Sequence, residues 1–131
     1  DSCTLSLTAK QWRKGGSGHP NTYPFGYACG PFLSPRLSGL TPFPSLDLHS
    51  VISSVGATAL NGNLPANQYF IQQSIGSLHW KPGEQLLLRW DDRDEPGNDD
   101  ALSIDQFSFT ASGIVPTDII IPEIKAVTIP D

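Results

Sequence analysis

The sequence contains no methionine, only two cysteines and no long hydrophobic run. No segment reaches the roughly 18 consecutive apolar residues that cross a bilayer, so no membrane span is expected. The chain starts at Asp1 and no secretion signal opens it. We therefore interpret it as a processed mature form or an excised domain.

Basic residues are also scarce. Lys and Arg total 8 against 13 Asp and Glu, which leaves a formal net charge of −5. Only Lys10, Arg13 and Lys14 lie close together in the sequence. Because phosphate binding needs a basic patch, nucleic acid is not an expected partner.

Sequence signals for catalysis are missing as well. His19, His49 and His79 are isolated from one another and from both cysteines. There is no G-x-S-x-G elbow, no HExxH and no phosphate loop. A glycosidase needs two carboxyl groups on opposite sides of a cleft, whereas the acidic residues of this chain cluster on one loop. We expect no catalytic residues and no enzyme activity.

What the sequence does contain is glycine and proline, 12 of each, spread along 131 residues. These residues favour short strands and tight turns over long helices. Apolar, alternating or aromatic segments between the turns are the expected strands. They are Thr4–Ala9, Tyr23–Cys29, Pro42–Ser50, Gln68–Ile75, Leu86–Trp90 and Leu102–Phe109. Such a pattern predicts one all-β domain over residues 1–111, an antiparallel, jelly-roll-like β-sandwich.

The last of these strands changes phase. Leu102 and Ile104 alternate with polar residues, and Phe107 and Phe109 follow after one extra residue. A β-bulge at Asp105-Gln106 supplies one extra residue and keeps both pairs on the core face. It would also redirect the Asp105 side chain.

The two cysteines, Cys3 and Cys29, lie in neighbouring predicted strands on either side of a turn-rich segment. An antiparallel pair centred on Gly16 places them opposite each other, which predicts a disulfide and an oxidising compartment. The alternative is two independent thiols in a cytosolic protein. Metal binding by the cysteines is not expected, because there is no CxxC or Cys/His cluster.

The segment Leu86–Phe109 holds a dense acidic loop between two apolar strands. Carboxylates this close repel one another, so the loop is either solvated or neutralised by a cation. Calcium is a candidate cofactor because it takes six to eight oxygen ligands. The spacing fails as an EF-hand, since Pro96 and Ser103 stand at ligand positions. The candidate ligands of a looser site are Asp92, Asp94, Asp99 and Asp105. A solvated acidic turn is the alternative.

The C-terminal segment 112–131 is apolar and punctuated by prolines. Its β-branched residues argue against a disordered linker. It is expected to add a strand to its own sheet or to a neighbouring subunit, and a plain linker to another domain is the alternative. Its candidate assembly residues are Ile119, Ile120, Ile121, Ile124, Val127 and Ile129.

Five segments together resemble a family of secreted bacterial β-sandwich modules found in large extracellular and surface proteins. They are LSLTAKQWRKGG (5–16), SLDLHS (45–50), ALNGNLPANQ (59–68), GSLHWKPGEQLLLRW (76–90) and DDRDEPGNDDALSIDQFSFTA (91–111). Family members typically show "EQWR", "LDGN-x-x-AN", "APG-x-x-L-x-LRW" and "SGND-x-x-L-x-IDDFS", in this order. The last two motifs are the most specific. The resemblance implies an extracellular or cell-surface location and no catalytic machinery.

The chain departs from those motifs at three positions. Lys10 replaces the Glu of "EQWR", Gln68 replaces the usual Arg after "AN", and Gln106 replaces the second Asp of "IDD". Family domains also carry strands before the "EQWR" strand, so this sandwich is expected to be incomplete by itself. Either the chain is a fragment or a processed product, or a strand from another chain completes the sandwich, as in a filament built by strand exchange.

Tryptophans are the remaining candidates for a binding role. Trp90 ends an apolar strand and is expected in the core, as most aromatic residues are. Trp12 precedes a glycine-rich turn, and Tyr23 lies across the predicted hairpin from it. Trp12 and Tyr23 are therefore the candidate sugar contacts if polysaccharide is a ligand.

Three functions follow from these features. The first is a non-catalytic extracellular structural or adhesive protein, such as a filament or surface-layer subunit that self-associates through its tail. The second is a carbohydrate-binding module. The third is a passive spacer domain of a larger secreted protein.

Overall fold

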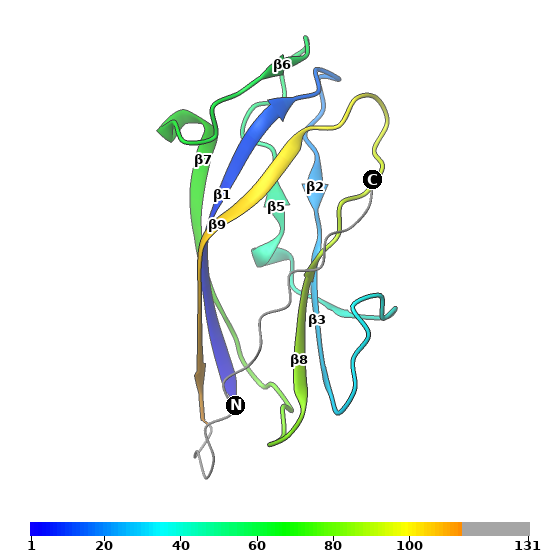
Figure 1. The fold of residues 1–131 in the computed structure, drawn as a ribbon, viewed down its shortest axis with the longest axis vertical. Helices are drawn as coiled ribbons and strands as arrows, with labels where there is room; N and C mark the ends of the chain where they lie inside the picture. Colours follow the sequence, from blue (N-terminus) through cyan, green and yellow to red (C-terminus); the bar gives the residue numbers. More distant parts are fainter. Residues whose placement is uncertain (114–131) are drawn as a thin grey trace.

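The computed structural model describes residues 1–113, which form an antiparallel β-sandwich (Figure 1). The predicted all-β fold is confirmed. Two short 3₁₀ turns, η1 (Pro44–Leu46) and η2 (Pro65–Asn67), are the helical elements of the described part. The strands are β1 (Ser2–Lys14), β2 (Thr22–Tyr23), β3 (Phe25–Gly30), β4 (Thr41–Pro42), β5 (Leu48–His49), β6 (Thr58–Ala59), β7 (Gln68–Ile75), β8 (Gln85–Trp90) and β9 (Ala101–Ser112).

Strand β1 is the centre of the first layer. It pairs with β9 along one side and with β7 on the other, and its last residues pair with β6. Its sequence alternates, so that Cys3, Leu5, Leu7 and Ala9 are buried while the residues between them face outward. The inner face of the strand stays buried from Cys3 to Gln11, so most of its length packs on the core.

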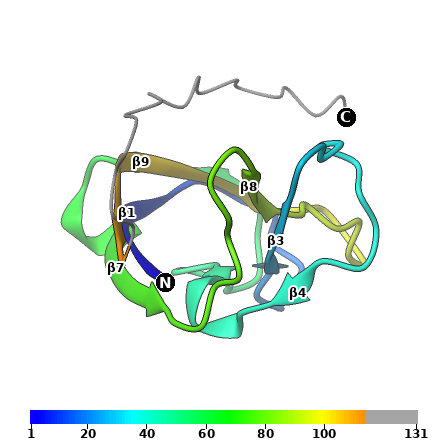
Figure 2. The ribbon, with the colours of Figure 1, turned by 90° about the horizontal axis from the view of Figure 1, so that it is seen from below.

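The second layer is made of shorter pieces (Figure 2). Strand β3 pairs with β8 and, for two residues, with β4; β2 pairs with β5. Pro24 separates β2 from β3, since proline cannot donate a ladder hydrogen bond. Trp90 packs on Phe25 with ring centroids 4.9 Å apart, which confirms its expected core position.

The predicted β-bulge is confirmed. The β1–β9 register shifts between Ser6 and Thr8, and Gln106 has a φ of 52°. Beyond the shift, Phe109 again packs against the core, as Leu102 and Ile104 do before it. The bulge therefore keeps the apolar side chains of both halves of β9 toward the core.

The predicted pairing of residues 3–9 with residues 23–29 is wrong. Both sides of β1 are occupied by strands that are distant in sequence, and β3 lies in the other layer. The glycine-rich connection crosses between layers instead of closing a hairpin. A Cβ on Gly15 would lie 1.9 Å from the carbonyl oxygen of Asn98, so only glycine fits at this crossing.

The predicted strand Pro42–Ser50 is also corrected. It consists of β4, η1 and β5, with Pro44 opening the 3₁₀ turn. Prolines at 42 and 44 each lack a backbone N–H, so a continuous strand would lose two ladder donors.

Two side-chain amides from the family-like motifs, those of Gln11 and Asn67, have structural roles. The side chain of Gln11 is fully buried, and its oxygen accepts hydrogen bonds of 2.8 Å from the amides of Val51 and Ile52. Its nitrogen donates to the carbonyls of Arg13 and Ile52. Asn67 donates to the carbonyl of Asn61. These side-chain amides bond backbone groups that have no partner in a neighbouring strand.

Arg89 fastens a loop of the second layer. Its guanidinium donates to the carbonyls of Pro35 and Leu37 and lies against Asp91, with Nε 2.8 Å from Oδ1. Nη2 also donates a hydrogen bond of 3.3 Å to Asp91 Oδ2, so the contact combines an ion pair with a hydrogen bond. The loop over residues 31–40 is thereby held against β3.

Replacing Gln11 with alanine should lower the free energy of unfolding by about 2–4 kcal/mol, because it leaves buried backbone groups without partners. The matched control is Gln72→Ala on the exposed face of β7, which should cost at most about 0.5 kcal/mol. Urea denaturation of both variants measures the difference. Equal losses would contradict the assigned role of Gln11.

Candidate functional site

One side of the sandwich has two open sheet edges. Within the described residues, β8 pairs only with β3, and β9 pairs only with β1. The two edges are neighbours across the layers, since Phe107 on β9 meets Trp90 on β8 with ring centroids 6.5 Å apart. Figures 1 and 2 both place β8 on the β9 side of the molecule. We call this the β8–β9 side.

The described residues cover the core incompletely along the β8–β9 side. Phe107 is 42% exposed, and the other inward apolar side chains of the two strands are only partly buried. These are Leu86, Leu88, Trp90, Leu102, Ile104 and Phe109. Unpaired edge groups beside half-covered apolar side chains are the features that accept an added strand.

The residues predicted to donate such a strand belong to the C-terminal segment. Ile119, Ile120, Ile121, Ile124, Val127 and Ile129 lie outside the described residues.

The outer face of the first layer is polar. Hydroxyl groups pair across its strands, Ser2 with Ser112, Thr4 with Ser74, and Ser6 with Ser108. Short side chains in hydrogen-bonded pairs give a flat surface with few mobile groups.

Lys10 is the centre of a three-residue cluster on this face. Its Nζ donates to Asp105 Oδ2 at 2.6 Å and to Asn63 Oδ1 at 2.8 Å. The Lys10 side chain is only 12% exposed, while that of Asp105 is 52% exposed. Hydrogen bonds from Lys10 and from the Gln106 amide lower the pKa of Asp105, so this carboxyl group is a carboxylate in the ion pair.

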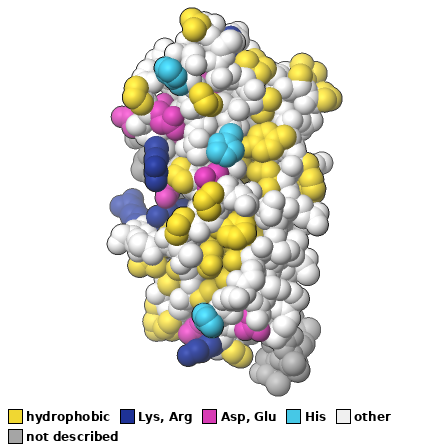
Figure 3. All heavy atoms as spheres, turned by 180° about the vertical axis from the view of Figure 1, so that it is seen from behind, with side chains coloured by type: hydrophobic (Ala, Val, Ile, Leu, Met, Phe, Trp, Pro, Cys, Tyr) yellow, Lys and Arg dark blue, Asp and Glu magenta, His cyan; other side chains and the backbone are white. Residues whose placement is uncertain are grey.

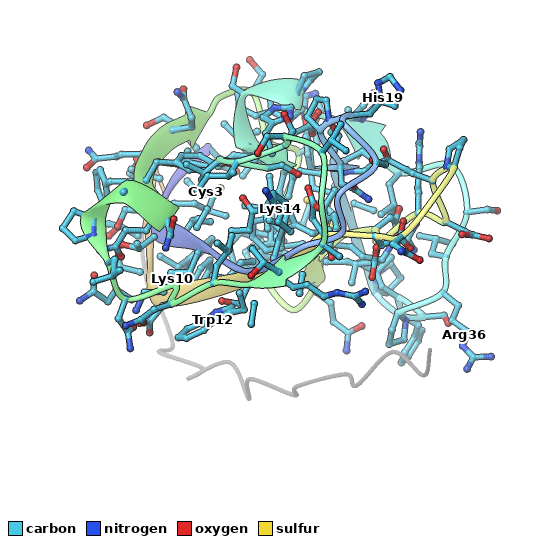
Figure 4. The ribbon with its side chains drawn as sticks, turned by 90° about the horizontal axis from the view of Figure 1, so that it is seen from above. Cys3, Lys10, Trp12, Lys14, His19 and Arg36 are labelled. Atoms are coloured by element: carbon cyan, nitrogen blue, oxygen red, sulfur yellow. The ribbon has the colours of Figure 1, made fainter. Side chains whose placement is uncertain are left out.

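Trp12 lies next to the cluster, on the same outward side of β1 (Figure 4). Its indole N–H donates to Ser103 Oγ at 2.8 Å, and its ring covers Gly62, where a Cβ would lie 2.6 Å from the ring. Trp12 remains 38% exposed. Phe70, which is 63% exposed, lies opposite Thr8 on the same face. The two aromatic side chains therefore share one surface with Lys10 between them along β1.

Tyr23 does not join this surface. It lies on β2 in the other layer, packs against the core and donates from its hydroxyl to the carbonyl of Asp100. Burial, followed by the negative charge of Asp92, raises the pKa of the phenol. The prediction that placed Tyr23 beside Trp12 depended on a hairpin between residues 3–9 and 23–29. It is wrong because these segments do not pair.

The acidic loop binds backbone amides of the connection between the layers. Asp100 is buried and accepts from the Gly15 amide at 2.6 Å and from the Ser50 hydroxyl. Asp99 accepts from the Asn21 side chain, and Glu95 from the Thr22 amide. Three of the loop's carboxylates thus act as acceptors for protein donors, which reduces their mutual repulsion.

The four predicted calcium ligands do not come together. Asp99 is bound to Asn21, and Asp105 pairs with Lys10 on the bulge of β9. Asp92 lies near the Tyr23 hydroxyl, and Asp94 is exposed. No cluster of three or more metal-ligating side chains occurs within residues 1–113.

Cys3 and Cys29 are free thiols, so the predicted disulfide is absent from the structure. Cys3 faces the core from β1, as Figure 4 shows, and Cys29 lies on β3 of the opposite layer. Burial raises the pKa of both thiols, and the nearby Cys29 raises that of Cys3 further. The hairpin register that predicted the disulfide is wrong, although the two side chains are close enough to interact.

A shallow hollow of about 190 Å³ lies on the outer side of the second layer. Gly26 and Gly39 leave room for it, Leu40 and Pro42 form apolar walls, and Arg93 stands at its border. On the face seen in Figure 3, Lys and Arg side chains occur in small groups toward one edge and do not form a broad basic surface.

The sequence pattern gave little sign of the Lys10 cluster. Alternation along β1 puts Lys10 on the outer face, but Asn63 is 53 residues away and Asp105 is 95 residues away. Only the strand register brings them together. Phe70 could be found from the alternation of β7, in which Ile71 and Ile75 face inward.

Comparison of the chain with protein-family models, with curated proteins and with solved structures finds no match. Within residues 1–113, no helix has the length and apolar character needed to cross a membrane.

Replacing Asp100 with alanine should lower the free energy of unfolding by about 1–3 kcal/mol, because the Gly15 amide loses a buried acceptor. Asp94→Ala removes an equal charge from an exposed position of the same loop and should change stability by at most about 0.5 kcal/mol. Thermal and urea unfolding of the two variants give the comparison. A larger loss in the Asp94 variant would refute the assigned role of Asp100.

Proposed function

We propose that the chain is a non-catalytic structural subunit of an extracellular assembly, built by β-strand addition between copies. The segment 114–131 of one copy pairs with the β8–β9 side of the next. The observation that carries this proposal is the pair of edges that find no partner strand within residues 1–113, beside partly exposed apolar side chains. The resemblance of residues 5–111 to secreted surface modules supports the extracellular location.

The composition of the segment suits this role. Residues 114–131 read IVPTDIIIPEIKAVTIPD, with β-branched side chains concentrated between prolines. Such residues favour extended backbone and supply apolar side chains for a half-covered core. Proline is tolerated in a strand that forms a sheet edge, because one side of that strand needs no partner.

The unpaired edge offers enough length. Strand β9 covers twelve residues, Ala101–Ser112, and its inward side chains include Ile104, Phe107 and Phe109. A donated strand lying along β9 would cover these groups and pair the free backbone. Repetition of this head-to-tail contact gives an open array, because each copy donates one segment and accepts one.

Charged substitutions in the segment should abolish assembly. Ile120→Asp combined with Ile124→Asp places two carboxylates against an apolar surface, and we expect monomers by size exclusion with light scattering. The matched control is Thr117→Asp with Thr128→Asp, which adds the same charge at polar positions and should still assemble. A wild-type chain that is monomeric at high concentration would contradict the proposal and would favour a passive spacer domain.

A second candidate function is carbohydrate binding on the outer face of the first layer. The observation in its favour is that Trp12 and Phe70, both exposed, project from the same face with polar side chains between them. Exposed aromatic rings on a flat sheet can stack on sugar rings, and neighbouring amide and hydroxyl groups can bind sugar hydroxyls.

Phe70→Ala should weaken binding to a polysaccharide by about two- to tenfold, since one aromatic stacking contact is worth about 0.5–1.5 kcal/mol. Phe32→Ala is the matched control, because Phe32 is 91% exposed but belongs to the loop over β3. A glycan array with the wild-type chain selects the ligand, and calorimetry compares the variants. The absence of any glycan that both binds the wild type and discriminates Phe70→Ala would reject this function.

A further inference from the structure

The Lys10 cluster combines the three groups that form an amide bond between side chains. Lys10 supplies an amine, Asn63 a carboxamide and Asp105 a carboxylate in contact with the amine. They come from β1, from the turn between β6 and β7, and from the bulge of β9. We propose that Lys10 and Asn63 form an intramolecular isopeptide bond, with Asp105 transferring the protons.

The distances favour attack on the amide carbon. Nζ lies 2.8 Å from Asn63 Oδ1, and the carbon is one C=O bond of about 1.2 Å from that oxygen. The nucleophile is therefore at most about 4 Å from the carbon, close to the 3–3.5 Å of a near-attack geometry. A small rotation of the exposed Asn63 side chain closes this difference.

The bulge explains why Asp105 is available. Its extra residue, Gln106, has a positive φ and donates its amide to Asp105 Oδ1 at 2.8 Å. This contact leaves Oδ2 directed at Lys10. Bulges often orient a side chain next to a reactive site, and here the oriented group is the one that contacts the nucleophile.

The step balances without any further reactant. A proton passes from the Lys10 ammonium to the Asp105 carboxylate, and the neutral amine attacks the Asn63 carbon. Asp105 returns the proton to the amide nitrogen, the carbon–nitrogen bond breaks, and ammonia departs. The second proton lost by Nζ leaves through Asp105 and converts ammonia to ammonium. The product is a Lys10–Asn63 amide, and Asp105 ends as a carboxylate.

The surroundings set the rate. The ion pair is the resting state, and the exposure of Asp105 keeps its charge solvated, so the reactive neutral pair is a minor species. We therefore expect a slow reaction in the folded chain. It proceeds to completion because one amide replaces another while ammonia escapes into bulk solution.

Intact-mass spectrometry of the full chain after prolonged incubation at physiological temperature tests the proposal. The expected result is a loss of one ammonia from the wild type, with resistance to trypsin after Lys10 and a linked peptide containing residues 10 and 63. Lys10→Arg keeps the charge next to Asp105 but has no nucleophilic amine, so it should retain its full mass. Asp105→Asn should lose ammonia more slowly than the wild type.

Two controls separate the cross-link from other events. Succinimide formation at Asn61-Gly62 also releases ammonia, but it would occur equally in Lys10→Arg and would leave no linked peptide. An equal loss in both proteins, with no linked peptide in the wild type, overturns the proposal. Lys14→Arg should behave as the wild type. If Lys10→Arg does not fold, Asn63→Ala removes the electrophile from an exposed position. A folded wild type that keeps its full mass also overturns the proposal, which does not depend on the assembly proposed above.

Discussion

The structure depends on the double pairing of β1. This strand has β9 on one side and β7 on the other, so it supplies the ladder that joins the two ends of the described chain. Its inner side chains, from Cys3 to Ala9, are all buried. Loss of either neighbour would leave a central apolar strand as an edge, which is the arrangement that folded proteins avoid. The acidic loop, the Gln11 amide and the β9 bulge all serve to keep β1 between its partners.

The same arrangement creates the exposed features. Within the described residues β9 pairs only with β1, so its other edge is unpaired. This edge lies beside the unpaired edge of β8. The outer residues of β1 alternate with the buried ones. Lys10 and Trp12 therefore lie on the outer face of the sheet, between β9 and the Asn61–Asn67 turn. The open side is thus an edge of the first sheet, whereas the Lys10 cluster lies on its outer face, and a strand added at the edge of β9 leaves the cluster accessible.

Local features of the fold could be predicted from the sequence, while long-range pairing could not. The strand Gln68–Ile75 and the β-bulge at Asp105-Gln106 follow from alternation and its change of phase. The cysteine pairing failed because a turn rich in glycine serves equally well for a hairpin or for a crossing between layers. Only contacts such as Gly15 against Asn98 distinguish the two, and these join residues that no local pattern relates. For the same reason Tyr23 was misplaced and the partners of Lys10 were not found.

An assembly joined through β9 would need β9 to be held firmly within its own subunit. Force applied along a donated strand would reach β9 first and pass to β1 through their hydrogen-bonded ladder. Lys10 lies at the half of that ladder beyond the bulge, where it contacts Asp105 on β9 and Asn63 in the turn that leads to β7. The cluster thereby connects β9, β1 and the approach to β7 at one point. A covalent link from Lys10 to Asn63 would fix β1 against that turn, and the Asp105 contact would carry the connection on to β9 only as an ion pair. The β1–β9 ladder would then remain the weaker connection, because its hydrogen bonds can separate in sequence while an amide bond cannot.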